Sequence, residues 1–354
     1  MEMQNTNIPM LELLLRPAFY VTDGRITQIN QAAASYMLNV GDEISPLVAT
    51  GLEDYQTLRE GCLYLTLSIA GKKIDATIIA SDNQHLFVLD QDSALTELRA
   101  LSLAARELRT PLTGMLSSAG QLLPPDPDPV QMSQFNRRMH QIMRIVSNMS
   151  DAVYYCESTS GRMEYVQICS FLEELLDKGQ EQLAQAGIHL QYSMPNKPIY
   201  TLADTEKLER AVYNLISNAA KHTPPNGTIT ISLTCRNRLY LSVTDSGYGN
   251  SNCVQANAYY RYLRTPSVTD GPEGIGLGMV LIRAAAALHN GTVLIDRPDG
   301  QGTRVTMTME IRQDKTSVFR SPLFYPDYAG ERDHGLQELS DVLPASLYAK
   351  ENIF

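Results

Sequence analysis

The chain has no tryptophan, and none of its five cysteines is spaced as in a CxxC motif. These scattered cysteines exclude a disulfide framework and a zinc ribbon, and they predict reduced, mostly buried thiols. Basic residues are not in excess either, because 39 Asp and Glu residues outnumber 29 Lys and Arg residues. An acidic chain is poorly suited to a broad nucleic-acid surface, which needs clustered positive charge.

Long apolar runs are also missing. No run approaches the roughly 20 apolar residues that a helix needs to span a bilayer. The first 15 residues, MEMQNTNIPMLELLL, lack the basic flank of a signal peptide. We therefore expect a cytoplasmic protein with neither a membrane nor a nucleic acid as partner. Its 354 residues are enough for two or three domains.

Residues 8–92 predict a small α/β module. The stretch PAFYVTDGRITQIN has two short apolar runs on either side of a turn at Asp23–Gly24. Further on, three runs rich in Leu, Ile and Val are separated by AGKK and SDNQ, as in an antiparallel meander. This pattern resembles a PAS sensor domain, although no motif indicates which signal such a module would sense.

Residues 93–158 predict two long helices joined by a turn. Apolar residues recur every three or four positions, as in a helical seam, and the four prolines of LLPPDPDPV must interrupt it. The two seams consist of Leu98, Leu101, Ala105, Leu108, Leu112, Met115, Ala119 and Leu122, and of Phe135, Met139, Ile142, Val146, Met149, Val153 and Cys156. One hairpin gives a thin core, so we expect two copies of the chain to form a four-helix bundle, which makes a homodimer.

Residues 165–312 alternate helical and strand patterns, which predicts an α/β sandwich with one open sheet. The tail, residues 313–354, contains aromatic residues and a helical stretch, GLQELSDVL. We expect this tail to lie on a folded surface. The fold class is therefore an α+β multidomain protein.

Three motifs in residues 165–312 suit a nucleotide. Asn214, Asn218 and Lys221 fall at i, i+4 and i+7 of one helix, where oxygen donors and a cation could hold hydrated Mg²⁺ and phosphate. In VTDSGYG, the Asp245 carboxylate can accept a hydrogen bond from an exocyclic amino group. Taken singly, the first motif could be the polar face of an ordinary helix and the second an ordinary turn. The glycines that would let the backbone approach a ligand are Gly247 and Gly249, and Gly274, Gly276 and Gly278 around Leu277.

These motifs, followed by GQGTRVTMTM with Thr303, resemble the four nucleotide-binding boxes of the Bergerat-fold (GHKL) ATPases. YYRYLR, residues 259–264, is similar to a box of the sensor histidine kinases. The resemblance implies that Asn218 binds Mg²⁺, Lys221 contacts phosphate, Asp245 binds the adenine amino group and Arg264 approaches the γ-phosphate. It also places His222 at a position that is usually aromatic, where its imidazole packs structurally, packs on the nucleotide or donates to phosphate. Asn250 departs from the family pattern, which usually has an apolar residue there.

The stretch AARELRTPLTGM, residues 104–115, resembles the H-box helix of the same kinases, but Arg106 stands where the phosphoacceptor histidine is expected. A guanidinium stays protonated and offers no lone pair to attack a phosphate, so autophosphorylation at this site should be lost. His140 is the other histidine of the hairpin, and we expect a packed or solvated side chain rather than a relocated acceptor.

Glu107 and Thr110 remain, and in the family this ExxT pair helps to position a water against the aspartyl phosphate of a response regulator. The alternatives are a surface ion pair between Arg106 and Glu107 and a hydrogen bond from Thr110 to backbone near Pro111.

The resemblance implies an ATP- and Mg²⁺-binding protein of a two-component phosphorelay, with a response-regulator receiver domain as partner. Its role is that of a regulator phosphatase, a kinase acting on a partner protomer, or an ATP-responsive scaffold without enzyme activity. A GHKL ATPase outside the phosphorelay, such as a serine kinase of the anti-sigma type, is the alternative, but it would not need an H-box helix.

Overall fold

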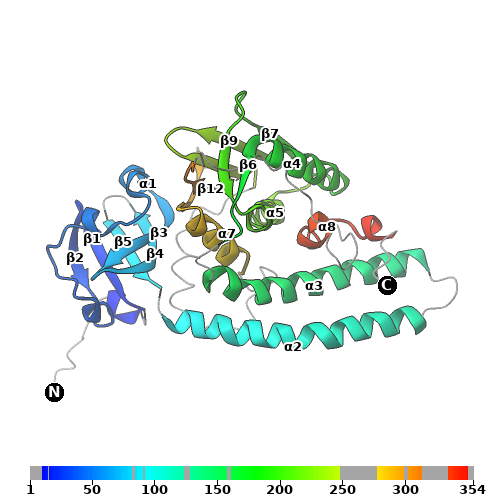
Figure 1. Ribbon diagram of the computed structural model, residues 1–354, viewed down its shortest axis with the longest axis horizontal. Helices are drawn as coiled ribbons and strands as arrows, with labels where there is room; N and C mark the ends of the chain where they lie inside the picture. Colours follow the sequence, from blue (N-terminus) through cyan, green and yellow to red (C-terminus); the bar gives the residue numbers. More distant parts are fainter. Residues whose placement is uncertain are drawn as a thin grey trace, which may run out of the picture.

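The computed structural model describes residues 10–14, 16–81, 84–90, 92–122, 128–157, 161–247, 277–298, 302–312 and 334–349. Figure 1 shows an N-terminal module (blue), a pair of long helices and a C-terminal module. In the described residues, no helix combines the length and the apolar character needed to cross a membrane.

The N-terminal module is built on five antiparallel strands in the order β2-β1-β5-β4-β3. The predicted turn at Asp23–Gly24 is confirmed, with positive φ at both residues, and Phe19 stacks on Phe87 in the core. The strands are β1 (Ala18–Thr22), β2 (Arg25–Ile29), β3 (Gly61–Ile69), β4 (Lys72–Ser81) and β5 (Gln84–Leu89). The helical turns are η1 (Met10–Leu13), η2 (Ala33–Tyr36), η3 (Ser45–Leu47) and α1 (Leu52–Thr57).

Helices α2 (Asp92–Leu122) and α3 (Pro129–Glu157) lie side by side as the predicted hairpin (Figure 1). Helix α2 continues through Pro111. Part of the predicted seam is buried in one chain: Ala105, Val146 and Met149 pack together, with Leu101 and Leu112 against them. Three other seam residues are exposed. Leu108, Met115 and Ile142 are 48%, 67% and 38% exposed.

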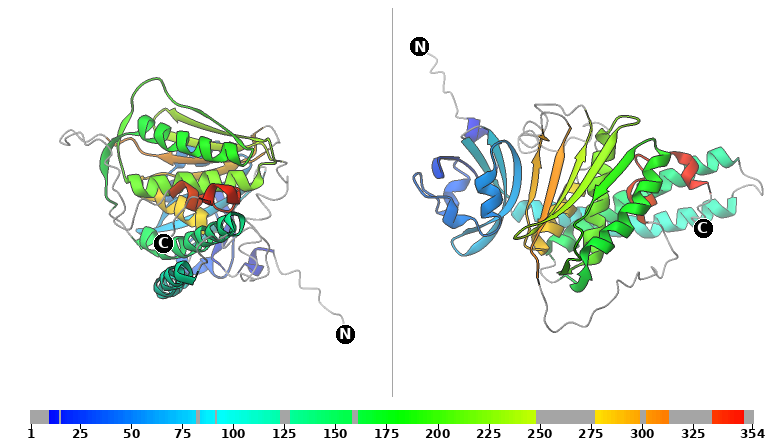
Figure 2. Two further views of the ribbon diagram at one scale, coloured as in Figure 1. Left: turned by 90° about the vertical axis from the view of Figure 1, so that its right-hand side faces the viewer. Right: turned by 90° about the horizontal axis from the view of Figure 1, so that it is seen from above.

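The C-terminal module packs helices against a sheet around one apolar core. Asp204 caps α5 by accepting a hydrogen bond from the Lys207 backbone N–H. Helices α5 and α7 lie between the sheet and α3 (Figures 1 and 2). The helices are α4 (Ile168–Gln185), α5 (Thr205–His222), α7 (Leu277–Leu288), α8 (His334–Glu338) and η5 (Ala345–Tyr348). The strands are β6 (Glu164–Gln167), β7 (His189–Ser193), β8 (Tyr200–Ala203), β9 (Thr228–Cys235), β10 (Leu239–Asp245), β11 (Val293–Asp296) and β12 (Arg304–Met309).

The expectation of one open sheet confined to residues 165–312 is wrong. Strand β11 pairs with β3 of the N-terminal module, so ten strands form one sheet across both modules (Figure 2). Without this pairing, β3 and β11 would each be an edge strand with unpaired backbone N–H and C=O groups. Side chains reinforce the pairing: the Arg283 guanidinium lies 4.4 Å from the centre of the Tyr64 ring and forms an ion pair with Asp90.

Residues 334–349 pack on the folded surface, as expected for this part of the tail. Leu339, Leu343 and Tyr348 are completely buried. The helix is shorter than GLQELSDVL suggested, because α8 ends at Glu338 and turns follow. The aromatic residues between 318 and 328 lie outside the described residues.

A test of the β3–β11 pairing uses Gly61, the first residue of β3, and Gly71, in the turn between β3 and β4. Both Gly61 and Gly71 have positive φ, but a Cβ at Gly61 would lie 2.4 Å from the Ile295 carbonyl oxygen, and one at Gly71 would meet nothing within 4 Å. We expect Gly71→Ala to cost about 1 kcal/mol through its backbone conformation, and Gly61→Ala about 1–3 kcal/mol more through the clash. Hydrogen exchange of the β11 amides should accelerate in Gly61→Ala alone. Equal protection in both variants would contradict the pairing.

Candidate functional site

The three polar residues predicted on one helix all lie on α5, but in different surroundings. Asn214 is completely buried, and its Nδ2 donates to the Arg210 carbonyl at 2.8 Å. Its Oδ1 is buried and accepts no hydrogen bond within the described part of the chain. Asn218 is half-buried. Lys221 forms an ion pair that the sequence did not predict.

Gly278 allows α7 to approach α5 closely. A Cβ at this position would lie 2.6 Å from Oδ1 of Asn214. The amide oxygen of Asn214 therefore faces the start of α7, where two further predicted site residues, Leu277 and Gly278, lie. Leu277, the first residue of α7, instead packs toward the hairpin, in one apolar cluster with Ala105, Val146 and Met149.

Asp245 ends β10 in a tight backbone setting. Its Oδ1 accepts from the Gly247 N–H at 2.9 Å, and its own N–H donates to the Thr303 carbonyl at 3.0 Å. Burial raises the pKa of Asp245, although the hydrogen bonds from Gly247 and Thr303 oppose this. A Cβ at Gly247 would lie 2.4 Å from the His222 carbonyl oxygen, so the ends of α5 and β10 meet here.

The His222 side chain is exposed, which does not fit the alternative of structural packing. The structure thus brings Asp245, Gly247 and Thr303 together beside the end of α5. Four predicted site residues lie outside the described residues: Gly249, Arg264, Gly274 and Gly276.

On the hairpin, the residues at the expected phosphoacceptor position face solvent. Arg106, Glu107 and Thr110 are all exposed on α2, next to the buried Ala105. Among the described residues, the Thr110 hydroxyl forms no hydrogen bond, whereas Thr113 Oγ1 donates to the Arg109 carbonyl at 2.9 Å. The backbone-bonding alternative therefore applies to Thr113 and not to Thr110.

His140 is buried and packs against the Tyr348 ring, with 5.0 Å between the ring centres. A side chain enclosed in this way is not accessible to a phosphate donor. Of the two expected settings, packed or solvated, the structure shows the packed one.

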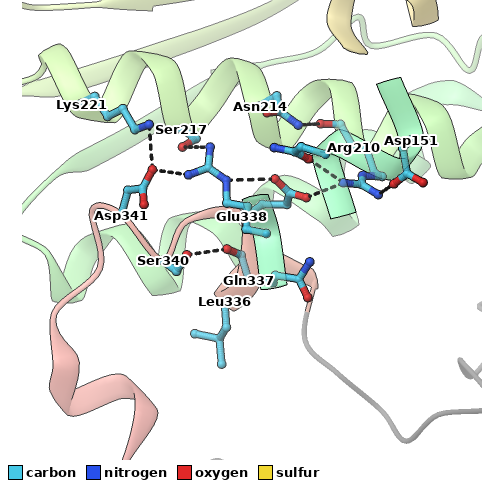
Figure 3. Close-up of polar contacts among 12 residues, drawn as sticks. Asp151, Arg210, Asn214, Ser217, Lys221, Leu336, Gln337, Glu338, Ser340 and Asp341 are labelled. Atoms are coloured by element: carbon cyan, nitrogen blue, oxygen red, sulfur yellow. Dashed lines mark hydrogen bonds and ion pairs between the residues drawn. The ribbon is translucent and has the colours of Figure 1, made fainter. Parts of the chain in front are cut away.

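A network of buried charges joins the hairpin, α5 and the end of the chain (Figure 3). Arg144 of α3 contacts Glu338 at 3.3 Å and donates to Ser217 Oγ at 3.1 Å. Arg210 of α5 contacts the other Glu338 oxygen at 3.2 Å, and it also pairs with Asp151 of α3. Glu338 is 3% exposed and accepts from two arginines, which compensates for its desolvation.

Asp341 extends this network to Lys221. It pairs with Arg144, and its carboxylate lies 2.7 Å from Lys221 Nζ (Figure 3). Burial alone would raise the pKa of Asp341, but the hydrogen bond from Lys221 and the charge of Arg144 hold it below its usual value. Sequence reasoning missed this network because its members are separated by up to about 200 residues; the only signal was a pair of acids three residues apart in the tail.

Comparison with known proteins agrees with this geometry. Residues 203–313 match the family of histidine kinase-, DNA gyrase B-, and HSP90-like ATPases. This part of the chain is therefore an ATPase domain of that type, and it contains α5, Asp245 and Thr303.

The longer matches are to sensor histidine kinases. The chain is 26% identical over 221 residues to the sensor histidine kinase WalK of Bacillus subtilis, covering 60% of this chain and 36% of WalK. It is 27% identical over 226 residues to the adaptive-response sensory kinase SasA of Crocosphaera subtropica, covering 60% and 59%. It is 27% identical over 229 residues to the signal transduction histidine-protein kinase/phosphatase MprB of Mycolicibacterium vanbaalenii, covering 62% and 47%. The chain thus matches less than two thirds of the length of each of these relatives.

Among solved structures, full-length ShkA in complex with AMPPNP has a similar fold, with a TM-score of 0.50 and 19% identity. The match covers 61% of this chain and 46% of ShkA. The similarity is one of fold alone.

Proposed function

We propose that this chain is a histidine kinase-like signalling protein that binds ATP and Mg²⁺ but cannot accept phosphate on its own hairpin. The observation that carries the proposal is the exposure of Arg106 on α2, in a chain with an ATPase domain of the histidine kinase type. The resemblance of AARELRTPLTGM to an H-box helix is what puts Arg106 at the phosphoacceptor position. Because arginine stays protonated, it cannot attack the γ-phosphate.

The described residues suit a bound nucleotide. Asp245 would accept from the adenine amino group. Gly247 lets the end of β10 pack closely on the end of α5, which places Asp245 beside that helix. The buried Oδ1 of Asn214 accepts no hydrogen bond among the described residues, so it would be available to a ligand atom or a water. Asn218 would hold Mg²⁺ and Lys221 a phosphate oxygen. The metal would neutralise phosphate charge when bound.

We propose that the hairpin acts on a response-regulator receiver domain as a phosphatase. Glu107 and Thr110 are both exposed, and the Thr110 hydroxyl has no competing hydrogen bond among the described residues. Together they could orient a water against an aspartyl phosphate, a reaction that needs no histidine nucleophile. The relative MprB is itself named a kinase/phosphatase.

Two further assignments complete the proposal. The N-terminal module would be the PAS-like sensor of a cytoplasmic protein. The hairpin would form a four-helix bundle with a second copy, because its exposed seam residues Leu108, Met115 and Ile142 would be covered there.

Nucleotide binding is tested with Asp245→Asn. We expect the unaltered protein to bind MgATP and the variant to bind it about 10- to 100-fold more weakly. In Asp245, Oδ1 accepts from Gly247 and the other oxygen is left for the adenine amino group, whereas asparagine has one oxygen for both and a donor in place of the second. Isothermal titration calorimetry measures both affinities, with Asp177→Asn on the exposed side of α4 as the matched control. Equal affinities for Asp245→Asn and the unaltered protein would contradict the site.

The same preparation tests the lost phosphoacceptor. With γ-labelled ATP, we expect no acid-labile label on the unaltered protein and label on Arg106→His, which restores an imidazole on the exposed face of α2. Label on the unaltered protein would overturn the proposal.

Phosphatase activity is tested on receiver domains phosphorylated with acetyl phosphate. We expect the protein to accelerate dephosphorylation of its partner regulator. Thr110→Ala should slow this about 10- to 100-fold, because a hydroxyl that would orient the attacking water is lost, and poor positioning can cost on the order of 10²-fold. Thr113→Ala, one turn away, should retain the rate because that hydroxyl bonds backbone. Similar losses in both variants would point to helix damage instead.

The dimer is tested with Leu108→Glu and Met115→Glu, two residues on one face of α2. A buried charge in the seam should convert the dimer to a monomer. Sedimentation velocity at micromolar concentration measures this, with Val40→Glu as control, since Val40 is 65% exposed on the N-terminal module. A monomeric unaltered protein would refute the dimer.

A further inference from the structure

We propose that residues 334–349, the C-terminal segment, are an internal inhibitor of nucleotide binding. In this segment the Asp341 carboxylate forms an ion pair with Lys221, the residue that would bind ATP phosphate. The inference rests on the proposed function of α5 as the nucleotide helix. It adds a regulatory element that neither the ATPase domain nor the hairpin contains.

The competition arises at Lys221. Its Nζ lies 2.7 Å from Asp341 Oδ2, and the same carboxylate pairs with Arg144. A phosphate that approached the remaining N–H donors of Lys221 would lie beside the Asp341 carboxylate, and two anions this close repel each other. Phosphate on Lys221 is therefore disfavoured while Asp341 keeps its place.

The hairpin positions the carboxylate for this contact. Arg137 Nε donates to the Ser340 carbonyl at 3.0 Å, and its Nη2 to the Asp341 carbonyl at 2.9 Å. Gln141 Nε2 also donates to the Ser340 carbonyl, at 3.1 Å. The backbone on both sides of the Asp341 side chain is thus fixed to α3. A side chain held in this way loses little further entropy when it binds Lys221.

Two parts of the C-terminal segment differ in how easily they can detach from α3 and α5. Glu338 is 3% exposed between two arginines, and Tyr348 is completely buried, with its carbonyl bonded to Asn136 Nδ2 at 2.9 Å. The Asp341 side chain, by contrast, is 34% exposed and Lys221 23%. Phosphate can therefore displace Asp341 at the solvent edge while Glu338 and Tyr348 keep the segment attached.

The contact couples the nucleotide to the hairpin. Asp341 is bonded to α5 through Lys221 and to α3 through Arg144, so a phosphate on Lys221 removes one connection between the ATPase domain and the hairpin. By linkage, the factor by which the segment weakens ATP binding equals the factor by which ATP weakens the segment's contact with α5. ATP would thereby loosen the arrangement that Figure 3 shows.

The test compares MgATP affinity in Asp341→Asn, Asp177→Asn and the unaltered full-length protein. Removing the Asp341 charge should raise the affinity about 10-fold, within the usual range of coupling between sites, and Asp177→Asn should leave it unchanged. An affinity in Asp341→Asn equal to or below that of the unaltered protein overturns the inference. If the unaltered protein binds MgATP, the proposed function survives that result. If neither protein binds MgATP, both fail.

A second measurement does not depend on the stability of a variant. Hydrogen exchange of residues 339–343 in the unaltered protein should accelerate when MgATP is added, and exchange around Tyr348 should change little. Unchanged exchange at 339–343 with bound nucleotide overturns the inference.

Discussion

The buried ion pairs of Glu338 with Arg144 and Arg210 decide how the hairpin, the ATPase domain and the end of the chain fit together. A carboxylate that is 3% exposed is stable only while both guanidiniums remain in place. Removing one partner of such a pair typically costs about 3–5 kcal/mol, because the remaining charge is left buried. The packing of α8 against α3 and α5 therefore cannot shift gradually, and any movement must occur at the more exposed Asp341–Lys221 contact.

A second constraint acts at the opposite side of the ATPase domain. The pairing of β11 with β3 makes the N-terminal module an extension of the ATPase sheet, and Arg283 joins it to Asp90 and Tyr64. A change in the proposed sensor thus has a direct route to the ATPase domain, through backbone hydrogen bonds, besides the route along α2. The ATPase domain is held by the N-terminal module on one side and by the C-terminal segment on the other.

The exposed position of Arg106 separates two parts of histidine kinase chemistry. Phosphate acceptance requires a nucleophile that arginine lacks, whereas the proposed activation of water by Glu107 and Thr110 does not. Leu108 and Met115 of α2 face solvent, and a second hairpin could cover them next to Glu107 and Thr110. With the proposed function, the protein would bind nucleotide and act on a phosphorylated response regulator without carrying phosphate itself.

The sequence alone determined most of the local structure and the kind of domain. Helical periodicity located α2 and α3, and strand patterns located β9 to β12. The glycine and asparagine motifs indicated an ATPase domain, and the comparisons support it. Such features follow from residues close together in the chain, so spacing is enough to recognise them.

Only the tertiary structure decided where those elements meet. No periodicity indicates that β11 pairs with β3, because an edge strand can accept any partner with free backbone groups. No motif connects Arg144, Lys221 and Asp341, because an ion pair depends on distance in space and not on spacing along the chain. The predicted phosphate ligand Lys221 was identified by its helix position, and its engagement by Asp341 became visible only once α8 was packed against α5.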